Sequence, residues 1–219
     1  MNIFSAASKK TKRIYFNLED LFFEKKYGFD FSGIIYPHQL IGVQSESLSH
    51  AKAYHAVWCA NLRKINTELK KRNYSFDVFV DIGSGKGKAC IYADLNKFSK
   101  ESIVVEFTKK LVKIAESNKE KCDSKKVTFI NCDALNYRLP SKDCLVFMFN
   151  PFDGDILEQF LLNNIAHFAQ FNSVLAYAND VERDILKRLN FSELYRSNSR
   201  NLSIHSYELP LPELEFKKL

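Results

Sequence analysis

The chain has 219 residues, of which 46% are hydrophobic and 26% charged, and its formal net charge is +6. This length and apolar content fit a globular domain with an extension and exclude a disordered chain. No run reaches the ~18 apolar residues of a membrane span, and residues 1–13 lack the apolar stretch of a secretory signal.

The cysteines and histidines are scattered, which argues against a metal site or a disulfide framework. No two cysteines form a CxxC pair, and His50 and His55 miss the spacing that puts two ligands on one helix face. We therefore expect no metal, a cytoplasmic location and reduced thiols at Cys59, Cys90, Cys122, Cys132 and Cys144.

The positive net charge suits an anionic partner such as a nucleic acid. However, the lysines are spread along the chain, and the two basic clusters, at residues 9–13 and 70–72, are typical of solvated faces. A nucleic-acid partner therefore stays open without being favoured. The sequence does not predict an oligomeric state.

Residues 1–75 differ from the rest and are expected to form a helical N-terminal cap. A short helix is predicted over residues 17–26, and a turn-rich aromatic connector follows it. A longer helix is predicted to end near Arg72, with Ser47 or Ser49 as its N-cap.

The longer helix carries an apolar stripe that would dock onto the main sheet, formed by Trp58, Leu62, Ile65 and Leu69. Tyr54 and His55 of the same helix could cover a bound cofactor. Ordinary packing is the simpler interpretation of these two residues.

Strands and helices alternate over residues 76–219, which is the pattern of βαβ units and of an α/β fold. The almost wholly apolar run at residues 144–150 indicates a strand covered by helices on both sides. Residues 191–197 and 202–209 are expected to form an antiparallel pair. The other strands are predicted over residues 77–82, 102–107, 127–131, 144–150 and 173–178, and the helices over residues 86–95, 109–119, 155–171 and 180–189.

The most informative stretch is the first of these strands and the loop after it, residues 77–87. A short apolar strand ends near Asp81 and is followed by glycines at alternate positions, Gly83, Gly85 and Gly87. Glycine lacks Cβ and tolerates positive φ, so such a loop brings bare backbone close to a ligand. Strand ends of open α/β sheets are where ligands bind. The loop therefore predicts a cofactor site.

Three carboxylates, Asp81, Glu106 and Asp133, each lie near the end of a predicted strand. Glu106 is nineteen residues beyond Gly87, an offset at which a carboxylate can accept hydrogen bonds from both hydroxyls of a ribose. Asp133 could accept one from the amine of a base, and Asp81 one from an ammonium group. A cofactor with an ammonium, a ribose and an adenine fits this set better than one with a pyrophosphate. The simpler interpretation is that each carboxylate caps the helix that follows its strand. Capping explains one such carboxylate better than it explains all three together.

The chain resembles a class I S-adenosylmethionine-dependent methyltransferase over residues 76–209. The resemblance rests on an ordered set of motifs: Asp81-Ile-Gly-Ser-Gly-Lys-Gly, Val104-Val-Glu106-Phe, Cys132-Asp133-Ala134 and Asn150-Pro151-Phe152. It implies a Rossmann-like, mostly parallel sheet of seven strands, with helices on both faces and an antiparallel last strand. The cap of residues 1–75 would then be a helical N-terminal extension.

The resemblance also implies S-adenosylmethionine as the cofactor. Its methionine part would lie over the glycine loop, with Glu106 on the ribose and Asp133 on the adenine. The implied cofactor-binding residues are Asp81, Gly83, Ser84, Gly85, Gly87, Glu106, Phe107, Asp133, Ala134 and Asn150.

Two other nucleotide-binding patterns fit less well. A dinucleotide-binding enzyme requires G-x-G-x-x-G, whereas Lys88 stands where the last glycine should fall. A P-loop is excluded, because no G-x-x-x-x-G-K-[ST] can be drawn through Gly83 to Lys88.

Asn150, Pro151 and Phe152 are the predicted catalytic residues, since the resemblance places them beside the transferred methyl group. In amino-methylating relatives the motif has two prolines before an aromatic residue, and its amide oxygen and a backbone carbonyl grip a planar amine. This chain has one proline, so recognition of a planar amine is left open. The simpler interpretation is a proline that ends a strand and a phenylalanine that packs. The chain also resembles a little-described bacterial branch that shares Asn-Pro-Phe and an upstream connector matched by residues 30–34.

No clear general base stands beside this motif. Asp153 and Asp155 are candidates by position, but carboxylates at a helix start more often act as caps. Methyl transfer needs mainly positioning, and it needs a base only where the acceptor must first lose a proton. The acceptor stays unknown: a protein or small molecule is slightly preferred, and a nucleic acid is the alternative. The alternative to an enzyme is a non-catalytic module that binds the cofactor.

Overall fold

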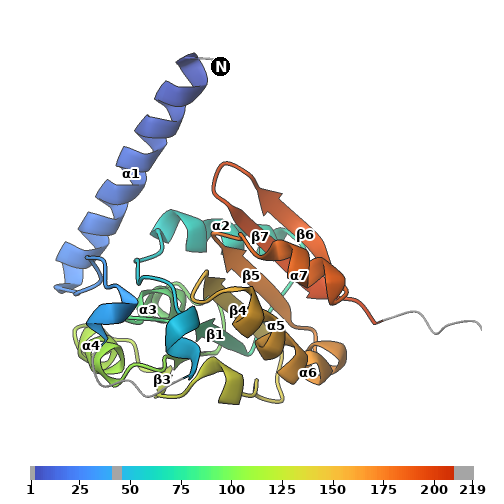
Figure 1. Cartoon of the computed structure of the whole chain (residues 1–219). Helices are drawn as coiled ribbons and strands as arrows, with labels where there is room; N and C mark the ends of the chain where they lie inside the picture. Colours follow the sequence, from blue (N-terminus) through green and yellow to red (C-terminus); the bar gives the residue numbers. More distant parts are fainter. Residues whose placement is uncertain (1–2, 41–45, 210–219) are drawn as a thin grey trace, which may run out of the picture.

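The computed structural model describes residues 3–40 and 46–209 (Figure 1). Its strands are β1 (Val78–Ile82), β2 (Glu101–Val105), β3 (Val127–Ile130), β4 (Cys144–Phe149), β5 (Val174–Ala178), β6 (Phe191–Ser197) and β7 (Leu202–Tyr207). They form one sheet in the order β3-β2-β1-β4-β5-β7-β6, in which β1 to β5 are parallel and β7 is antiparallel to both its neighbours. The predicted Rossmann-like sheet with an antiparallel last strand is confirmed.

The helices are α1 (Ile3–Tyr27), α2 (Cys59–Lys71), α3 (Lys88–Leu95), α4 (Lys109–Glu120), α5 (Gly154–Asn163), α6 (Ile165–Gln170) and α7 (Arg183–Arg188). Three short 3₁₀ turns are η1 (Pro37–Gln39), η2 (Glu46–His50) and η3 (Ala134–Asn136). Within the residues that the structure describes, no helix is both long and apolar enough to cross a membrane.

Helices cover both faces of the sheet, which explains why its central strands are apolar throughout. Every residue of β1 and β5 is buried. On one face Phe79 shares a core with Leu62 and other residues of α2 and α3. On the other face Val80 shares a core with Leu157 and Phe160 of α5. Alternate residues of β1 therefore anchor two separate layers of helices.

The helix predicted over residues 17–26 extends over Ile3–Tyr27, and its N-terminal part projects from the body (Figure 1). The added turns have no apolar stripe, but their lysines, alanines and arginine favour helix. The C-terminal half of α1 docks onto the body. Asp20 forms a 2.9 Å ion pair with Lys88, and the rings of Phe16 and Trp58 lie 5.5 Å apart.

The helix predicted to start at Ser47 or Ser49 begins only at Cys59, so neither serine caps it. Residues 51–57 are not helical, because other segments take up their backbone groups: Ala51 pairs with Phe152, and Tyr54 pairs with Ile35. The cap of α2 comes from another part of the chain, since the Asp20 carboxylate accepts from the backbone N–H of Cys59 at 2.9 Å.

The helix predicted over residues 155–171 is two helices, α5 and α6, divided at Asn164. The Asn164 side chain is buried and bonds to the connector before β4, accepting from the Leu139 N–H at 2.9 Å and donating to the Tyr137 carbonyl at 3.3 Å. The helix predicted from residue 180 begins at Arg183, and the remaining boundaries agree with the prediction to within two residues.

The packing of α2 against the sheet yields a stability prediction. Leu62 is fully buried in the same core as Phe79, whereas Leu162 of α5 is 51% exposed. We expect Leu62→Ala to lower the free energy of unfolding by ~2–5 kcal/mol and Leu162→Ala to change it by less than about 0.5 kcal/mol. Urea unfolding followed by circular dichroism measures both. A Leu62→Ala protein as stable as wild type would contradict a core shared between α2 and the sheet.

Candidate functional site

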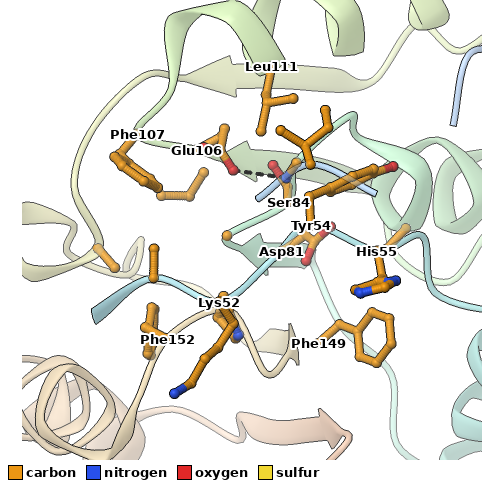
Figure 2. A pocket seen from close by; sticks show the side chains of 18 of the residues that line it. Lys52, Tyr54, His55, Asp81, Ser84, Glu106, Phe107, Leu111, Phe149 and Phe152 are labelled. Carbon is orange, nitrogen blue, oxygen red and sulfur yellow. Dashed lines mark hydrogen bonds between the residues drawn. The ribbon is translucent and has the colours of Figure 1, made fainter. Parts of the chain in front are cut away.

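A cavity opens at the carboxyl edge of the sheet, beyond the ends of β1, β2 and β4 (Figure 2). One wall is the glycine loop with the strand-end carboxylates. The opposite wall is residues 51–57, which we call the strap and which cross in front of these groups (Figure 2). The predicted site residues that line this cavity are Asp81, Gly83, Ser84, Gly85, Glu106, Phe107, Asp133, Ala134, Pro151 and Phe152. Gly87 and Asn150 do not line it.

The glycine loop takes the left-handed backbone that its sequence predicts, with φ of +69° at Gly83 and +56° at Gly85. Side chains from distant segments lie directly on both positions. A methyl group added at Gly83 would overlap Pro151, and one added at Gly85 would overlap the ring of Tyr54. Gly87 is the N-cap of α3 and allows α3 to approach Ala115. The glycines therefore allow side chains of the protein itself, Pro151 and Tyr54, to lie close to the backbone of the loop.

Glu106 is held rigidly at the end of β2. Its carboxylate is buried and accepts from the Gly85 N–H and the Thr108 N–H, both at 2.9 Å. Burial raises the pKa of Glu106 above its ordinary value, and these hydrogen bonds partly oppose the rise. A carboxylate has about four acceptor positions, so Glu106 can bind the loop and still accept from a ligand.

Asp81 is a buried carboxylate at the end of β1 that faces the cavity. Among the described residues, no hydrogen bond or ion pair reaches it. Burial, and then the negative charge of Glu106, raise the pKa of Asp81 well above its ordinary value. A ligand that brings a positive charge to this position would relieve that cost. The Ser84 hydroxyl beside it is also buried without a hydrogen-bond partner in the described part of the chain.

Asp133 lies beyond β3 and combines two roles. It caps η3 by accepting from the Leu135 N–H at 3.0 Å, so the simple capping interpretation holds for this residue. It also lines the cavity and accepts from the hydroxyl of Ser47 at 2.8 Å. Ser47, expected to be a helix cap, instead links the N-terminal segment to the cavity wall.

The oxygens of Asn150 and Pro151 are already engaged within the protein. Asn150 has φ of +44° and accepts from the Tyr177 hydroxyl at 3.1 Å. The Pro151 carbonyl accepts from the backbone N–H of Lys52 in the strap at 2.9 Å. The motif Asn150-Pro151-Phe152, which we call the fourth motif, therefore ends a strand and holds the strap. Both of its oxygens that could grip a planar amine already have partners.

Asp153 caps α5, which agrees with the simpler interpretation. It also bonds to His50, a contact that was not predicted. Its Oδ2 lies 2.7 Å from His50 Nδ1, and its N–H donates to the His50 carbonyl at 3.1 Å. Burial opposes ionisation, but the hydrogen bond from His50 lowers the pKa of Asp153. His50, Asp153 and the exposed Asp155 offer potential metal-ligand atoms within 4.8 Å of one another.

The strap is the part of the site that the sequence predicted least well. Tyr54 and His55 line the cavity, but from a non-helical segment. Lys52 and Ala51 were not predicted at all. The extended structure depends on backbone partners as far as about a hundred residues away, such as Phe152 for Ala51, and a local sequence pattern does not report such partners.

A family model described as a methyltransferase domain matches residues 74–209, which is more than half of the chain. No curated protein sequence matches it significantly.

Solved structures share the fold at low sequence identity. A candidate RNA methyltransferase from Pyrococcus horikoshii aligns with a TM-score of 0.53 and 17% identity over 79% of this chain and 95% of its own. Magnesium protoporphyrin IX methyltransferase from Synechocystis, with bound S-adenosylmethionine, aligns with a TM-score of 0.50 and 14% identity over 67% and 77%. The B. subtilis m1A22 tRNA methyltransferase aligns with a TM-score of 0.50 and 15% identity over 68% and 65%, so this chain spans slightly less than two thirds of it.

The family match agrees with the methyltransferase predicted from the motifs, and the Synechocystis enzyme that shares the fold was solved with bound S-adenosylmethionine. The chain belongs to the methyltransferase domain family and is an S-adenosylmethionine-dependent methyltransferase.

Proposed function

We propose that S-adenosylmethionine binds against the glycine loop, with Asp81, Glu106 and Asp133 as its three polar anchors. The observation that carries this proposal is Asp81, a buried carboxylate that faces the cavity with no partner among the described residues. A ligand ammonium would supply the missing countercharge. Glu106 would accept from the ribose and Asp133 from the adenine, at the ends of β2 and β3.

The residues present fit this cofactor. The Ser84 hydroxyl is an unpaired buried donor in the same cavity, and Glu106 is held in place by the Gly85 and Thr108 amides. Phe107 and Ala134 give apolar surface next to the two anchoring carboxylates. The cofactor supplies an electrophilic methyl group when bound. The chain's own residues bind it, orient it and keep water out, and such positioning can contribute up to ~7–11 kcal/mol in the best cases.

The fourth motif narrows the class of acceptor. The Asn150 amide oxygen accepts from Tyr177, and the Pro151 carbonyl accepts from Lys52. A planar amine would have to displace two internal hydrogen bonds to be gripped there. We therefore propose a flexible amine or a hydroxyl of a protein or small molecule as the acceptor, placed by Phe152 and the strap. If it must lose a proton, the hydrogen-bonded pair of His50 and Asp153, next to Phe152 in the chain but outside the cavity lining, and His55, which lines the cavity, are the candidate bases.

A nucleic acid is the second candidate. It is favoured by the net charge of +6 and by the RNA acceptors named for two structural neighbours. We place the chain in the bacterial branch with Asn-Pro-Phe and a connector like residues 30–34, with residues 1–75 as the cap that completes the pocket. Its five cysteines are all free, which supports a reducing cytoplasmic location.

The acceptor can be identified by incubating the protein and tritiated S-adenosylmethionine with a cell lysate, then separating protein, nucleic acid and small molecules. We expect label in protein or small molecules. Label only in nucleic acid would overturn the acceptor proposal, and label in no fraction would favour the non-catalytic module.

Glu106 and Asp133 provide the direct test of the cofactor site. We expect Glu106→Ala and Asp133→Ala each to weaken the affinity for S-adenosylhomocysteine about tenfold or more, which corresponds to ~1.4 kcal/mol for each factor of ten. The control is Asp155→Ala, which removes an exposed carboxylate outside the cavity. Isothermal titration calorimetry measures all three. Unchanged affinity for S-adenosylhomocysteine in the Glu106→Ala/Asp133→Ala double variant would contradict the proposed cofactor site.

Asp81 makes stability depend on pH. Because its pKa is raised in the folded state, folded protein binds a proton more tightly than the unfolded chain does. The stability from this proton is present below the ordinary value of 3.8 and is lost as pH rises through the folded-state pKa. We expect Asp81→Asn, free of ligand, to be more stable than wild type at pH 7, with the difference shrinking toward pH 4. Urea midpoints across this range measure it, and parallel pH profiles would contradict it.

A further inference from the structure

We infer that Tyr54 is a contact residue of the cofactor slot, and that Asp30, Lys86 and Asn118 are positioning residues that hold it there. The inference rests on the proposed function and extends it to residues before the matched methyltransferase domain. It also gives the connector at residues 30–34 a role. A continuous set of contacts runs from the glycine loop to the strap and supports this assignment.

The first contact starts at Lys86, which directly follows Gly85. Its side chain is buried, and its ammonium donates to Asp30 Oδ1 at 2.6 Å and to the Ser32 carbonyl at 2.7 Å. A buried charge is costly unless it is paired and hydrogen-bonded. Because Lys86 is fixed to the glycine loop by one peptide bond, its partners on the connector are fixed to the loop as well.

Asn118 of α4 locks the same two segments from the other side. Its Oδ1 accepts from the Asp30 N–H at 2.7 Å, and its Nδ2 donates to the carbonyls of Asp30 at 3.0 Å and Lys86 at 3.2 Å. The side chain is fully buried. One amide thus bonds to the connector and to the glycine loop at the same time, which fixes their separation.

The connector in turn holds Tyr54. Phe31 is fully buried against Phe29, Phe23 and Ile91, and its carbonyl accepts from the Tyr54 hydroxyl at 2.7 Å. The backbone of Tyr54 also pairs with Ile35. The Tyr54 ring therefore lies on the face of Gly85, beside Ser84 and Glu106 (Figure 2). The Lys86 ammonium is 5.6 Å from the centre of that ring.

This arrangement makes the ring of Tyr54, which lies in contact with Gly85, part of the lining of the cavity next to the glycine loop. A ligand that enters the slot meets Tyr54 together with Gly83, Ser84 and Gly85, and all four line the same cavity. Loss of the Asp30–Lys86 pair should therefore loosen the ring and weaken cofactor binding, although neither residue reaches the ligand itself.

The test compares two aspartates that each pair with a lysine at 2.6 Å. Asp30→Ala breaks the pair with the buried Lys86, and Asp77→Ala breaks the pair with the exposed Lys100 at the far end of β1. By calorimetry we expect Asp30→Ala to weaken the affinity for S-adenosylhomocysteine about tenfold, and Asp77→Ala to change it less than about twofold.

A second experiment measures how well the ligand protects the strap from trypsin. It uses the conservative variant Tyr54→Phe, which loses only the hydroxyl that donates to the Phe31 carbonyl. Trypsin cuts after the exposed Lys52, and mass spectrometry of the fragment that ends there gives the rate. We expect S-adenosylhomocysteine to slow this cut in wild type and in Asp77→Ala, and to slow it much less in Tyr54→Phe and Asp30→Ala. A purely structural role for these residues would leave the ligand protection unchanged.

The outcomes separate the two proposals. Wild-type protein that does not bind S-adenosylhomocysteine overturns the proposed function and this inference with it. Wild-type protein that binds it, while Asp30→Ala and Tyr54→Phe keep wild-type affinity and wild-type protection, overturns this inference alone.

A matched pair of glycines tests the contact between Tyr54 and Gly85 without ligand. Gly85 and Gly28 both have left-handed backbone, but an added methyl group overlaps Tyr54 only at Gly85 and meets nothing within 4 Å at Gly28. We expect Gly85→Ala to displace the ring and speed trypsin cleavage after Lys52 several-fold, by an overpacking effect, whereas Gly28→Ala leaves the rate close to wild type. Equal rates in the two variants would contradict a strap held on the glycine loop through Tyr54.

Discussion

The ammonium group of Lys86 sets the geometry of the whole site. It is buried next to the glycine loop, so it requires a nearby carboxylate, and Asp30 supplies it. With Asp30 fixed there, Phe31 is fixed in the core and its carbonyl holds Tyr54. This set of contacts links the Lys86 charge to the strap, whose backbone also pairs with Ile35 and Phe152.

The site thus has two sources. The sheet provides what a methyl donor requires: glycines that allow close approach, and carboxylates at the ends of neighbouring parallel strands. The N-terminal segment and the fourth motif are bonded to each other through Lys52 and Pro151, and in our proposal they form the acceptor side. In our proposal the common fold therefore binds the methyl donor, whereas loop segments beside the sheet place the acceptor.

The sheet and the carboxylate edge could be predicted because their signals are local. An apolar run, three alternate glycines and an acidic residue at each strand end are all visible within short windows around Asp81, Glu106 and Asp133. The strap could not be predicted, because residues 47–58 carry a helix-like start signal while their backbone partners lie at Ile35 and residues 151–153. The division at Asn164 was missed for the same reason: its amide is bound by a distant connector. The cofactor roles of the carboxylates and the acceptor role of Asn150, Pro151 and Phe152 stay predictions.

The ion pair between Lys86 and Asp30 also has a consequence for how the chain is made. On the ribosome the N-terminal segment emerges first, when Lys86, Asn118 and Pro151 do not yet exist. Tyr54 can pair with Ile35 as soon as both have emerged, but the pairs of the strap with Pro151 and Phe152 must wait until more than half of the polypeptide has been synthesised. During that interval the ring of Tyr54 lacks the glycine loop on which it packs in the folded protein, so the nascent chain exposes an aromatic side chain that the finished enzyme covers.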